Sequence, residues 1–412
     1  MLARGGYSKK LKYRLGFWPV LPAKKKNCKR IWIQAVSVGE LLSIQNFLIS
    51  LIKDSRVEIV LSGTTSTGLK IAEQKYSKNI LASGPFPLDW WPFSFLAWRR
   101  IKPDMVISVD SELWPEHMQQ ARKRNIPFCI INGRLSNRSY KRLKYAGLLR
   151  KLLIPDNLHV LASSDEQKKR WCKIGLDKNR VTSTGNLKID AISIRPPKTE
   201  EKNNLKNEMG FPENSIILAG ISTWPGEEKF LLDSIQKIRN DKIDARLLLI
   251  PRHAERRTEI IEEINSFNFS FHKRTSKSES TGENIVYLAD TTGELLELIK
   301  AADIAFLGKT LPPRGEGQNP LEPISAGIPV VLGPKCTNFS EIVESLLSFG
   351  AAHQGCSINE TKNLLFQILK DPEKRHDMHE AGIEWKIKQG SPSITTLGII
   401  KEMLFGEERN PS

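Results

Sequence analysis

The sequence has 412 residues, enough for two domains of ordinary size that each bury a core. Hydrophobic residues make up 40% of the chain and charged residues 26%, which is typical of a folded, water-soluble protein and excludes a disordered chain. A net charge of +16 indicates an anionic partner.

Cysteine usage and hydropathy exclude several classes of protein. The five cysteines are scattered, and none stands in a Cys-x-x-Cys pair, so neither a disulfide framework nor a metal site is predicted. No run of about 18 apolar residues predicts a membrane span, and no apolar segment predicts a cleavable signal peptide. We therefore expect a reducing cytosolic compartment and, at most, peripheral attachment to a membrane.

Residues 1–30 form a basic segment with ten lysines and arginines, no acidic residue and four aromatic residues. This mixture favours an anionic membrane surface, where each basic residue contributes about 1 kcal/mol. The alternative is a solvated terminal tail.

After this segment, apolar runs of strand length alternate with helical patterns. Strands are expected at residues 31–36, 58–62, 104–109, 127–132, 159–162 and 181–184, with helical patterns such as 41–53 and 136–152. Two prolines and a polar run around residues 194–204 interrupt both periodicities. The alternation then resumes, with strands at 215–221, 245–251, 284–288, 303–307 and 328–332, and helices from about 226, 254, 293, 320 and 339.

Such alternation predicts parallel sheets covered by helices on both faces. We predict an α/β protein of two Rossmann-like, doubly wound domains. The expected parts are the basic membrane-proximal segment 1–30, a first domain 31–195, a linker 196–204, a second domain 205–390 and a C-terminal helix and tail 391–412. Ligands bind beyond the carboxyl ends of strands in such folds, so the predicted site is the cleft between the domains.

Polar residues follow the first two expected strands. Ser37, Gly39 and Glu40 come after the first, where Glu40 can either take a proton from an attacking hydroxyl or stabilise its helix as a first-turn charge. Hydroxyls and glycines follow the second and can either hold a phosphate or sugar or only cap a helix; they are Thr64, Thr65, Thr67 and Gly68.

Three more charged residues follow later strands of the first half. Glu112 is either a site carboxylate or a helix-start charge, since Pro115 suits a first helical turn. Arg134 can hold a carboxylate or phosphate through two hydrogen bonds, although a surface arginine is the commoner explanation. Lys188 is a candidate cation for an anionic donor or transition state, or one more surface lysine.

In the second half, Arg252 follows an apolar strand and can meet a phosphate. Residues 303–323 form an apolar run, a glycine-rich loop and a helix start, an arrangement in which backbone N–H groups often face an anion. There Glu322 is placed to accept hydrogen bonds from two ribose hydroxyls. The alternative is an ordinary strand-loop-helix connection that binds nothing. Gly308-Lys309-Thr310 looks like the end of a P-loop, but that motif requires glycine where residue 303 is Asp, so an ATPase is not predicted.

Seven segments occurring in one order resemble the Kdo transferase family, the enzymes that add 3-deoxy-D-manno-octulosonic acid to the lipid A precursor. They span most of the chain and comprise Ala35-Val36-Ser37-Val38-Gly39-Glu40, Glu112-Leu113-Trp114-Pro115, Asn132-Gly133-Arg134-Leu135-Ser136, Gly185-Asn186-Leu187-Lys188, Pro251-Arg252-His253, Gly293-Glu294-Leu295 and Asn319-Pro320-Leu321-Glu322-Pro323.

The resemblance implies an inverting, metal-independent glycosyltransferase of the GT-B type that uses CMP-Kdo as donor and needs no cofactor. It implies that Glu40 is the general base and that Glu112 and Lys188 support the transition state. The expected partners are CMP-Kdo, the lipid A precursor and an anionic membrane surface, with no nucleic acid, at the cytoplasmic face of the bacterial inner membrane. The CMP-binding positions implied are Pro251, Arg252, Gly293, Glu294, Leu295, Asn319, Pro320, Leu321 and Glu322; candidate acceptor or Kdo contacts are Ser37, Gly39, Thr64, Thr65, Thr67, Gly68 and Arg134.

The chain departs from the family pattern in three places. Members usually begin with a hydrophobic anchoring helix, whereas this sequence opens on its basic segment. Gly308-Lys309-Thr310 stands where the family usually has glycine, glycine and serine. Gln318 stands where histidine is common, and an amide cannot carry a proton at neutral pH.

Two alternatives remain from the residues alone. Another GT-B nucleotide-sugar transferase or epimerase would share the fold and the ribose-binding glutamate. A basic protein that binds nucleic acid or a membrane surface without catalysis would share the charge, although no nucleic-acid recognition motif is present.

Overall fold

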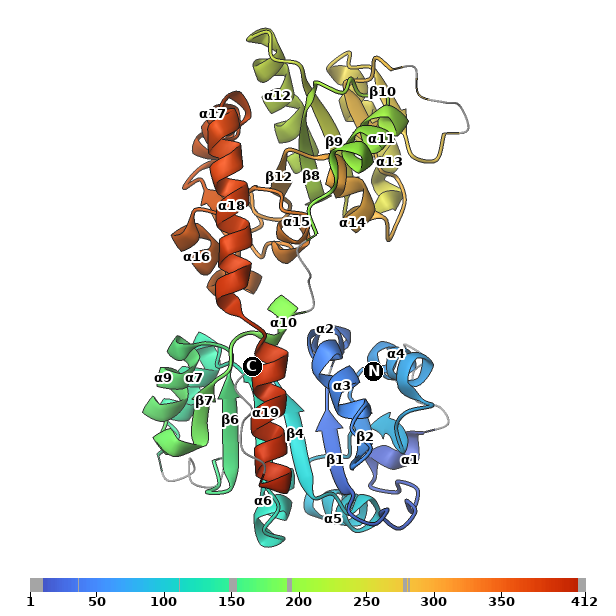
Figure 1. Ribbon diagram of the computed structural model, residues 1–412, viewed down its shortest axis with the longest axis vertical. Helices are drawn as coiled ribbons and strands as arrows, with labels where there is room; N and C mark the ends of the chain where they lie inside the picture. Colours follow the sequence, from blue (N-terminus) through green and yellow to red (C-terminus); the bar gives the residue numbers. More distant parts are fainter. Residues whose placement is uncertain are drawn as a thin grey trace. The chain divides into compact units, whose positions relative to one another are not determined.

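The computed structural model describes residues 10–35, 37–110, 112–147, 154–190, 195–276, 280 and 282–406. The chain forms two compact units: unit 1 is Met1–Ala191 with Ser391–Ser412, and unit 2 is Ile192–Gly390 (Figure 1). Each unit contains a seven-stranded sheet.

The sheet of unit 1 is parallel throughout, in the order β3-β2-β1-β4-β5-β6-β7. The central strand β1 pairs with β2 on one side and β4 on the other, so Gln34 lies opposite both Ser62 and Ser108. The strand order therefore reverses at β1, where ligands commonly bind in such sheets. The strands are β1 (Lys29–Gln34), β2 (Val57–Gly63), β3 (Ala82–Pro85), β4 (Met105–Val109), β5 (Phe128–Gly133), β6 (Leu158–Ala162) and β7 (Val181–Ser183).

Helices cover both faces of this sheet. Successive side chains of a strand point to opposite faces, so each face has its own hydrophobic core. Trp32 packs in one core, while Ile31 and Ile33 pack in the other. The second core also receives Ile399 and Ile400, so the C-terminal helix α19 belongs to unit 1 (red in Figure 1). The helices are α1 (Leu11–Arg14), α2 (Val38–Ser43), α3 (Gln45–Ile52), α4 (Ser66–Tyr76), α5 (Trp91–Ile101), α6 (Pro115–Lys123), α7 (Asn137–Lys144), α9 (Asp165–Lys173), η3 (Lys178–Arg180), α10 (Leu187–Asp190) and α19 (Pro392–Phe405).

Unit 2 repeats this plan with a parallel sheet in the order β10-β11-β9-β8-β12-β13-β14. Here the order reverses at β8, which pairs with β9 and β12. The strands are β8 (Ile216–Thr223), β9 (Ala245–Pro251), β10 (Phe271–Lys273), β11 (Val286–Leu288), β12 (Ile304–Leu307), β13 (Val330–Leu332) and β14 (Ala352–Gln354).

Two cores again lie on opposite faces of the sheet, with Leu218 in one and Ile217 and Ala219 in the other. The helices are α11 (Thr199–Met209), α12 (Glu227–Asn240), η4 (Ala254–Arg256), α13 (Arg257–Ser266), α14 (Leu295–Leu298), η5 (Ile299–Ala301), α15 (Leu321–Ser325), η6 (Thr337–Phe339), α16 (Ser340–Phe349), α17 (Ile358–Lys370) and α18 (Pro372–Gln389).

The predicted α/β class with two doubly wound sheets is confirmed. Strands β3, β10 and β14 were not expected, because their sequences Ala-Ser-Gly-Pro, Phe-His-Lys and Ala-His-Gln contain no apolar run. The segment expected as a linker, 196–204, includes the first turns of α11, and the tail beyond residue 406 lies outside the described residues. So does part of the helical pattern expected at 136–152, from residue 148 onwards.

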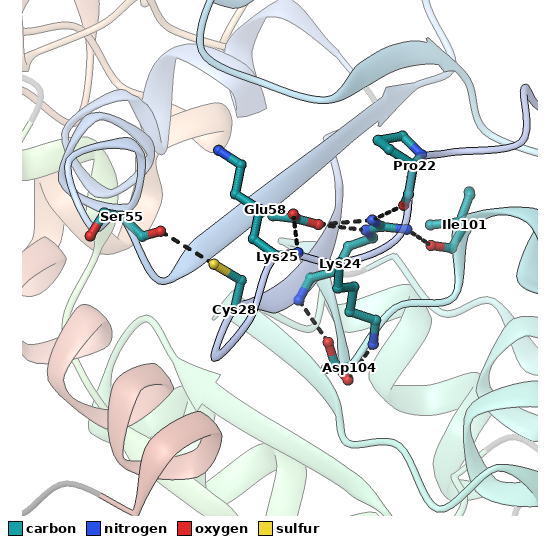
Figure 2. A network of polar contacts seen from close by, with 9 residues as sticks. Pro22, Lys24, Lys25, Cys28, Ser55, Glu58, Ile101 and Asp104 are labelled. Atoms are coloured by element: carbon teal, nitrogen blue, oxygen red, sulfur yellow. Dashed lines mark hydrogen bonds and ion pairs between the residues drawn. The ribbon is translucent and has the colours of Figure 1, made fainter.

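Part of the basic segment is structural. Arg30 is buried and forms an ion pair with Glu58 at 2.8 Å, and its guanidinium also donates to the carbonyls of Pro22 and Ile101. Figure 2 shows the surrounding network, in which Lys24 pairs with Asp104 at 2.6 Å. These contacts attach residues 22–30 to unit 1, while residues 1–9 lie outside the described part of the chain. None of the described helices has both the length and the apolar character that a membrane crossing requires.

Candidate active site

In unit 1, Glu40 lies in the first turn of α2, directly after the strand where the order reverses. Ser37 caps this helix: its Oγ accepts the Glu40 N–H at 3.3 Å and donates to Glu40 Oε1 at 3.2 Å. The Glu40 side chain is half-buried. The cap therefore orients a carboxylate that remains partly accessible.

The loop after β2 packs closely on this helix start. A Cβ on Gly68 would lie 3.4 Å from the backbone of Ser37 and Val38, so the start of α4 lies against the start of α2. Thr65 caps α4 by accepting the Gly68 N–H at 3.3 Å, and Thr65 and Thr67 are exposed. The candidate contacts Ser37, Gly39, Thr64, Thr65, Thr67 and Gly68 thus lie at or beside two helix starts that are in contact.

A buried asparagine joins three other site segments. Asn132, at the end of β5, donates to Asp110 Oδ1 at 2.5 Å, and its Oδ1 accepts the Leu187 N–H at 3.0 Å. It links the end of β5 to the residue after β4 and to the start of α10. Glu112, Arg134 and Lys188 lie within two residues of these three points. Asn132 is part of a motif recognised in the sequence. Its role as a bridge could not be predicted there, because its partners are distant in the chain.

Lys188 lies on α10, which packs against α2. Asn186 supports the start of α10 by accepting the Lys188 N–H at 3.1 Å. The structure therefore brings the candidate cation and the candidate base onto two helices that are in contact. Arg134 is half-buried beyond β5.

The Glu112 carboxyl lies in a desolvated position before α6. Burial raises the pKa of Glu112, and the negative charge of Asp110 raises it further. Its backbone carbonyl accepts a hydrogen bond from Ser108 Oγ at 3.0 Å, which fixes the loop. A carboxyl with a raised pKa can retain a proton and donate a hydrogen bond to a developing negative charge.

In unit 2, Arg252 follows β9 and Glu322 lies in the first turn of α15, close enough for their charges to interact. Burial raises the pKa of Glu322, while a hydrogen bond from Asn319 and the positive charge of Arg252 oppose the rise. Asn319 also accepts the Leu321 N–H at 3.2 Å at the start of α15, and Arg252 is exposed just after the buried Pro251. Glu322 can accept hydroxyl donors beside a cation, as the predicted ribose site requires.

Glu294 is held differently. Its carboxylate accepts hydrogen bonds from Thr291 and Arg274, which lower the pKa of Glu294. Gly293 has a φ of +95°, and a Cβ there would meet open space, so the turn before Leu295 is open to a ligand.

The glycine-rich loop after β12 corrects one expectation. Three of its backbone N–H groups do not face an open anion site, because the buried Glu227 carboxylate accepts those of Lys309, Thr310 and Leu311 at 2.8, 3.0 and 3.2 Å. The same carboxylate accepts the Trp224 N–H at 2.9 Å. Sequence reasoning missed Glu227, whose only signal was a glutamate at a helix start.

Side chains beside this loop instead gather around Trp224. Lys309 Nζ lies 4.6 Å and Arg314 Cζ 4.9 Å from its ring centroid, and the His253 ring is 5.1 Å away, edge to face. Lys309 adopts a φ of +63°, in a position where glycine would be unstrained. The departure at Lys309 therefore adds a cation above an aromatic ring.

Within the described ranges, no group of three or more His, Cys, Asp or Glu side chains is arranged to hold a metal ion. The site residues instead offer carboxylates, hydroxyls and cations at the carboxyl ends of two parallel sheets. Such groups can move a proton, bind hydroxyls and neutralise an anionic leaving group.

Comparison with known proteins defines the class. Residues 229–385 match the family Glycosyl transferases group 1. The structure of UDP-GlcNAc 2-epimerase from Neisseria meningitidis bound to UDP-GlcNAc has a similar fold, with a TM-score of 0.60 and 16% identity over 92% of this chain and 100% of that chain. The protein has the two-domain GT-B fold and is a glycosyltransferase.

The family follows from the first half of the chain and from relatives over nearly its whole length. Residues 9–191 match the family 3-Deoxy-D-manno-octulosonic-acid transferase (kdotransferase). The chain is 28% identical over 383 residues to the 3-deoxy-D-manno-octulosonic acid transferase of Bordetella pertussis, covering 91% of this chain and 87% of that protein. It is 29% identical over 408 residues to that of Haemophilus influenzae, covering 98% and 93%. The chain belongs to the Kdo transferase family.

Proposed function

We propose that the protein transfers Kdo from CMP-Kdo to a hydroxyl of the lipid A precursor with inversion at the anomeric carbon. The observation that carries this proposal is the contact between α2 and α10, which places Glu40 and Lys188 at one edge of the unit 1 sheet. Membership of the Kdo transferase family supports the choice of sugar.

In the proposed reaction, Glu40 accepts the proton of the acceptor hydroxyl as its oxygen attacks the anomeric carbon of Kdo. The new glycosidic bond forms on the face opposite CMP, the bond to the CMP phosphate breaks, and CMP leaves with the electron pair. Direct displacement of this kind inverts the configuration. Lys188 and Glu112 support the transition state of the transfer.

On the donor side, Glu322 accepts ribose hydroxyls of CMP and Arg252 compensates the phosphate charge. Pro251 with Arg252, Gly293 to Leu295 and Asn319 to Glu322 surround the nucleotide. CMP bears a single phosphate, so arginine and backbone donors can compensate its charge without a bound cation, and we propose metal-independent, cofactor-free transfer. Arg134 and the hydroxyls of Thr64, Thr65 and Thr67 are candidate contacts to the acceptor or Kdo.

The proposed location is the cytoplasmic face of the bacterial inner membrane, with peripheral attachment to an anionic surface. The lipid acceptor requires access to a bilayer, and the charge of +16 favours anionic lipid. We propose no nucleic-acid partner.

The test is incubation of the full chain with CMP-Kdo and a detergent-dispersed tetra-acylated lipid A precursor, followed by mass spectrometry. We expect a mass gain of one or more Kdo units with equimolar CMP release, unchanged by a chelator. Transfer from a UDP-sugar in place of CMP-Kdo would support another nucleotide-sugar enzyme of this fold. No mass gain from a folded, CMP-binding protein would overturn the proposal.

A further inference from the structure

Large apolar side chains are exposed mainly on one part of unit 1. Thirteen such side chains are exposed in the described residues, and seven of them lie within two short stretches, 11–20 and 88–91. Trp90 and Trp91 are 63% and 54% exposed, which is unusual for side chains of this size. The seven are Leu11, Leu15, Phe17, Val20, Leu88, Trp90 and Trp91.

The two stretches form a single surface. The Leu88 N–H donates to the Arg14 carbonyl at 2.9 Å, and Arg100 Nη1 donates to the Trp18 carbonyl at 2.6 Å. Gly16 has a φ of +81°, and a Cβ there would lie 2.3 Å from the Phe93 carbonyl oxygen, so residues 10–20 press directly against α5. We call residues 10–20 and 88–102 the aromatic face.

The aromatic face rests on a rigid base. Trp18 is fully buried and packs edge to face on Trp32 in the core, at 6.2 Å between ring centroids. Trp90 packs edge to face on Phe93 at 5.3 Å, and Trp91 stacks on Phe95 at 5.7 Å. The exposed rings are therefore held by neighbours while their outer faces remain open.

The charge of the aromatic face selects its partner. Six basic residues lie in the two stretches: Lys10, Lys12, Arg14, Arg99, Arg100 and Lys102. Asp89 is the single acidic residue there, and it is half-buried and accepts the His117 N–H at 3.0 Å. Lys12, Arg99 and Lys102 are exposed. Exposed tryptophans surrounded by basic residues suit the interface of an anionic bilayer, where the indole ring sits at headgroup level.

We propose that the aromatic face binds an anionic membrane, with Trp90 and Trp91 inserted into the interfacial region. This inference rests on the proposed function, since it names the surface through which the enzyme reaches a lipid acceptor. It differs from the sequence-based prediction, which assigned membrane contact to residues 1–30 alone. Arg30 and Lys24, in ion pairs with unit 1, contribute less to this contact than the two tryptophans do.

The chain's own fluorescence provides the test. Of nine tryptophans, Trp18, Trp32, Trp98, Trp171 and Trp385 are buried to 1% exposure or less, and Trp114 and Trp224 are half-buried. Vesicles containing phosphatidylglycerol and brominated phosphatidylcholine should therefore quench mainly Trp90 and Trp91. We expect quenching with these vesicles and little with vesicles of brominated phosphatidylcholine alone.

Substitution separates binding from catalysis. The double variant Trp90→Ser/Trp91→Ser should pellet with anionic vesicles about tenfold less than the unchanged chain, because two interfacial side chains are lost. It should keep its turnover with detergent-dispersed acceptor and its unfolding temperature. The variant Trp90→Phe/Trp91→Phe should still pellet with vesicles but lose the fluorescence quenching. The control Ile387→Ser, at an exposed apolar position in unit 2, should change neither vesicle pelleting nor quenching.

Three results would overturn the inference. One is full vesicle binding by the folded serine double variant, and another is equal binding to neutral and anionic vesicles. The third is dimerisation in solution that the serine substitutions abolish while vesicle binding persists, which would assign the aromatic face to a second copy of the chain. If the unsubstituted chain shows no Kdo transfer to the detergent-dispersed acceptor, the result would instead count against the proposed function.

Discussion

Two glutamates occupy equivalent places in the two units and are held in opposite ways. Glu40 lies in the first turn of the helix after β1, and Glu227 is the first residue of the helix after β8; in each sheet this is the strand where the order reverses. Glu40 is half-buried and contacts the hydroxyl of its own cap, Ser37. Glu227 is buried, and its carboxylate accepts four backbone N–H groups.

The neighbouring loop makes the difference. In unit 1, the adjacent loop after β2 presents the small Gly68 to the helix start and leaves Glu40 partly accessible. In unit 2, the loop after β12 wraps its N–H groups around Glu227. A glutamate at the reversal point can thus serve chemistry or hold a loop, depending on what its neighbour provides.

The largest expected effect is the loss of catalysis at Glu40. Glutamine keeps the size of the side chain but cannot accept the proton, so Glu40→Gln should lower turnover about 10²- to 10⁴-fold. The unfolding temperature should barely change. Initial rates of CMP release measure the first effect, and Glu200→Gln, an exposed first-turn glutamate of α11, is the matched control. Near-normal turnover of Glu40→Gln would contradict the assignment of Glu40 as general base. It would also contradict the contrast drawn between Glu40 and Glu227.

At Glu227 the same substitution should act on stability. Glu227→Gln replaces an oxygen that accepts backbone N–H groups by an NH₂ that cannot, and should lower the free energy of unfolding by about 1–3 kcal/mol. Denaturant unfolding measures this change. The exposed Glu360, in the first turn of α17, provides the control Glu360→Gln. A stable but inactive Glu227→Gln variant would show that Glu227 acts in catalysis instead.

Glu322 lies between these cases, because it is in the first turn of α15 but accepts a hydrogen bond from Asn319 and feels the positive charge of Arg252. Glu322→Gln should raise the KM for CMP-Kdo about tenfold, equivalent to roughly 1.4 kcal/mol, by weakening acceptance of ribose hydroxyls. Because burial raises the pKa of Glu322, donor affinity of the unchanged chain should fall as the pH is lowered through that raised pKa. Measurement of KM against pH tests this, and a pH dependence that persists in the glutamine variant would contradict it.

The smallest effect is expected at Glu112. Its ordinary pKa is 4.5 and its folded pKa is raised, so below 4.5 the carboxyl is protonated in both states and Glu112→Gln should leave stability unchanged. As the pH rises through the raised pKa, the unfolded chain releases this proton more readily, and the unchanged chain loses stability relative to the variant. The unfolding temperatures of the unchanged chain and of Glu112→Gln should therefore agree at pH 4 and differ at pH 8, where the variant should have the higher one. A variant less stable at pH 8 would contradict the raised pKa.

Much of the fold could be predicted from the alternation of apolar runs with helical patterns, because buried parallel strands such as β9 are apolar at every residue except Arg246. The candidate site could be predicted through motifs that place Glu40, Lys188 and Glu322 after strands. Hydrogen bonds between residues distant in the sequence could not be predicted. Asn132 reaches Asp110 and Leu187, and neither spacing carries a periodic signal.

The sequence by itself determined the α/β class, the family and the loops that carry the chemistry, because these depend on local pattern and on short motifs. The tertiary structure decided which groups remain available. The N–H groups of Lys309 and Thr310 are occupied by Glu227, Arg30 is buried against Glu58, and Trp90 is left exposed. Occupancy of this kind depends on which distant side chain arrives at each donor or apolar surface, and only packing determines that.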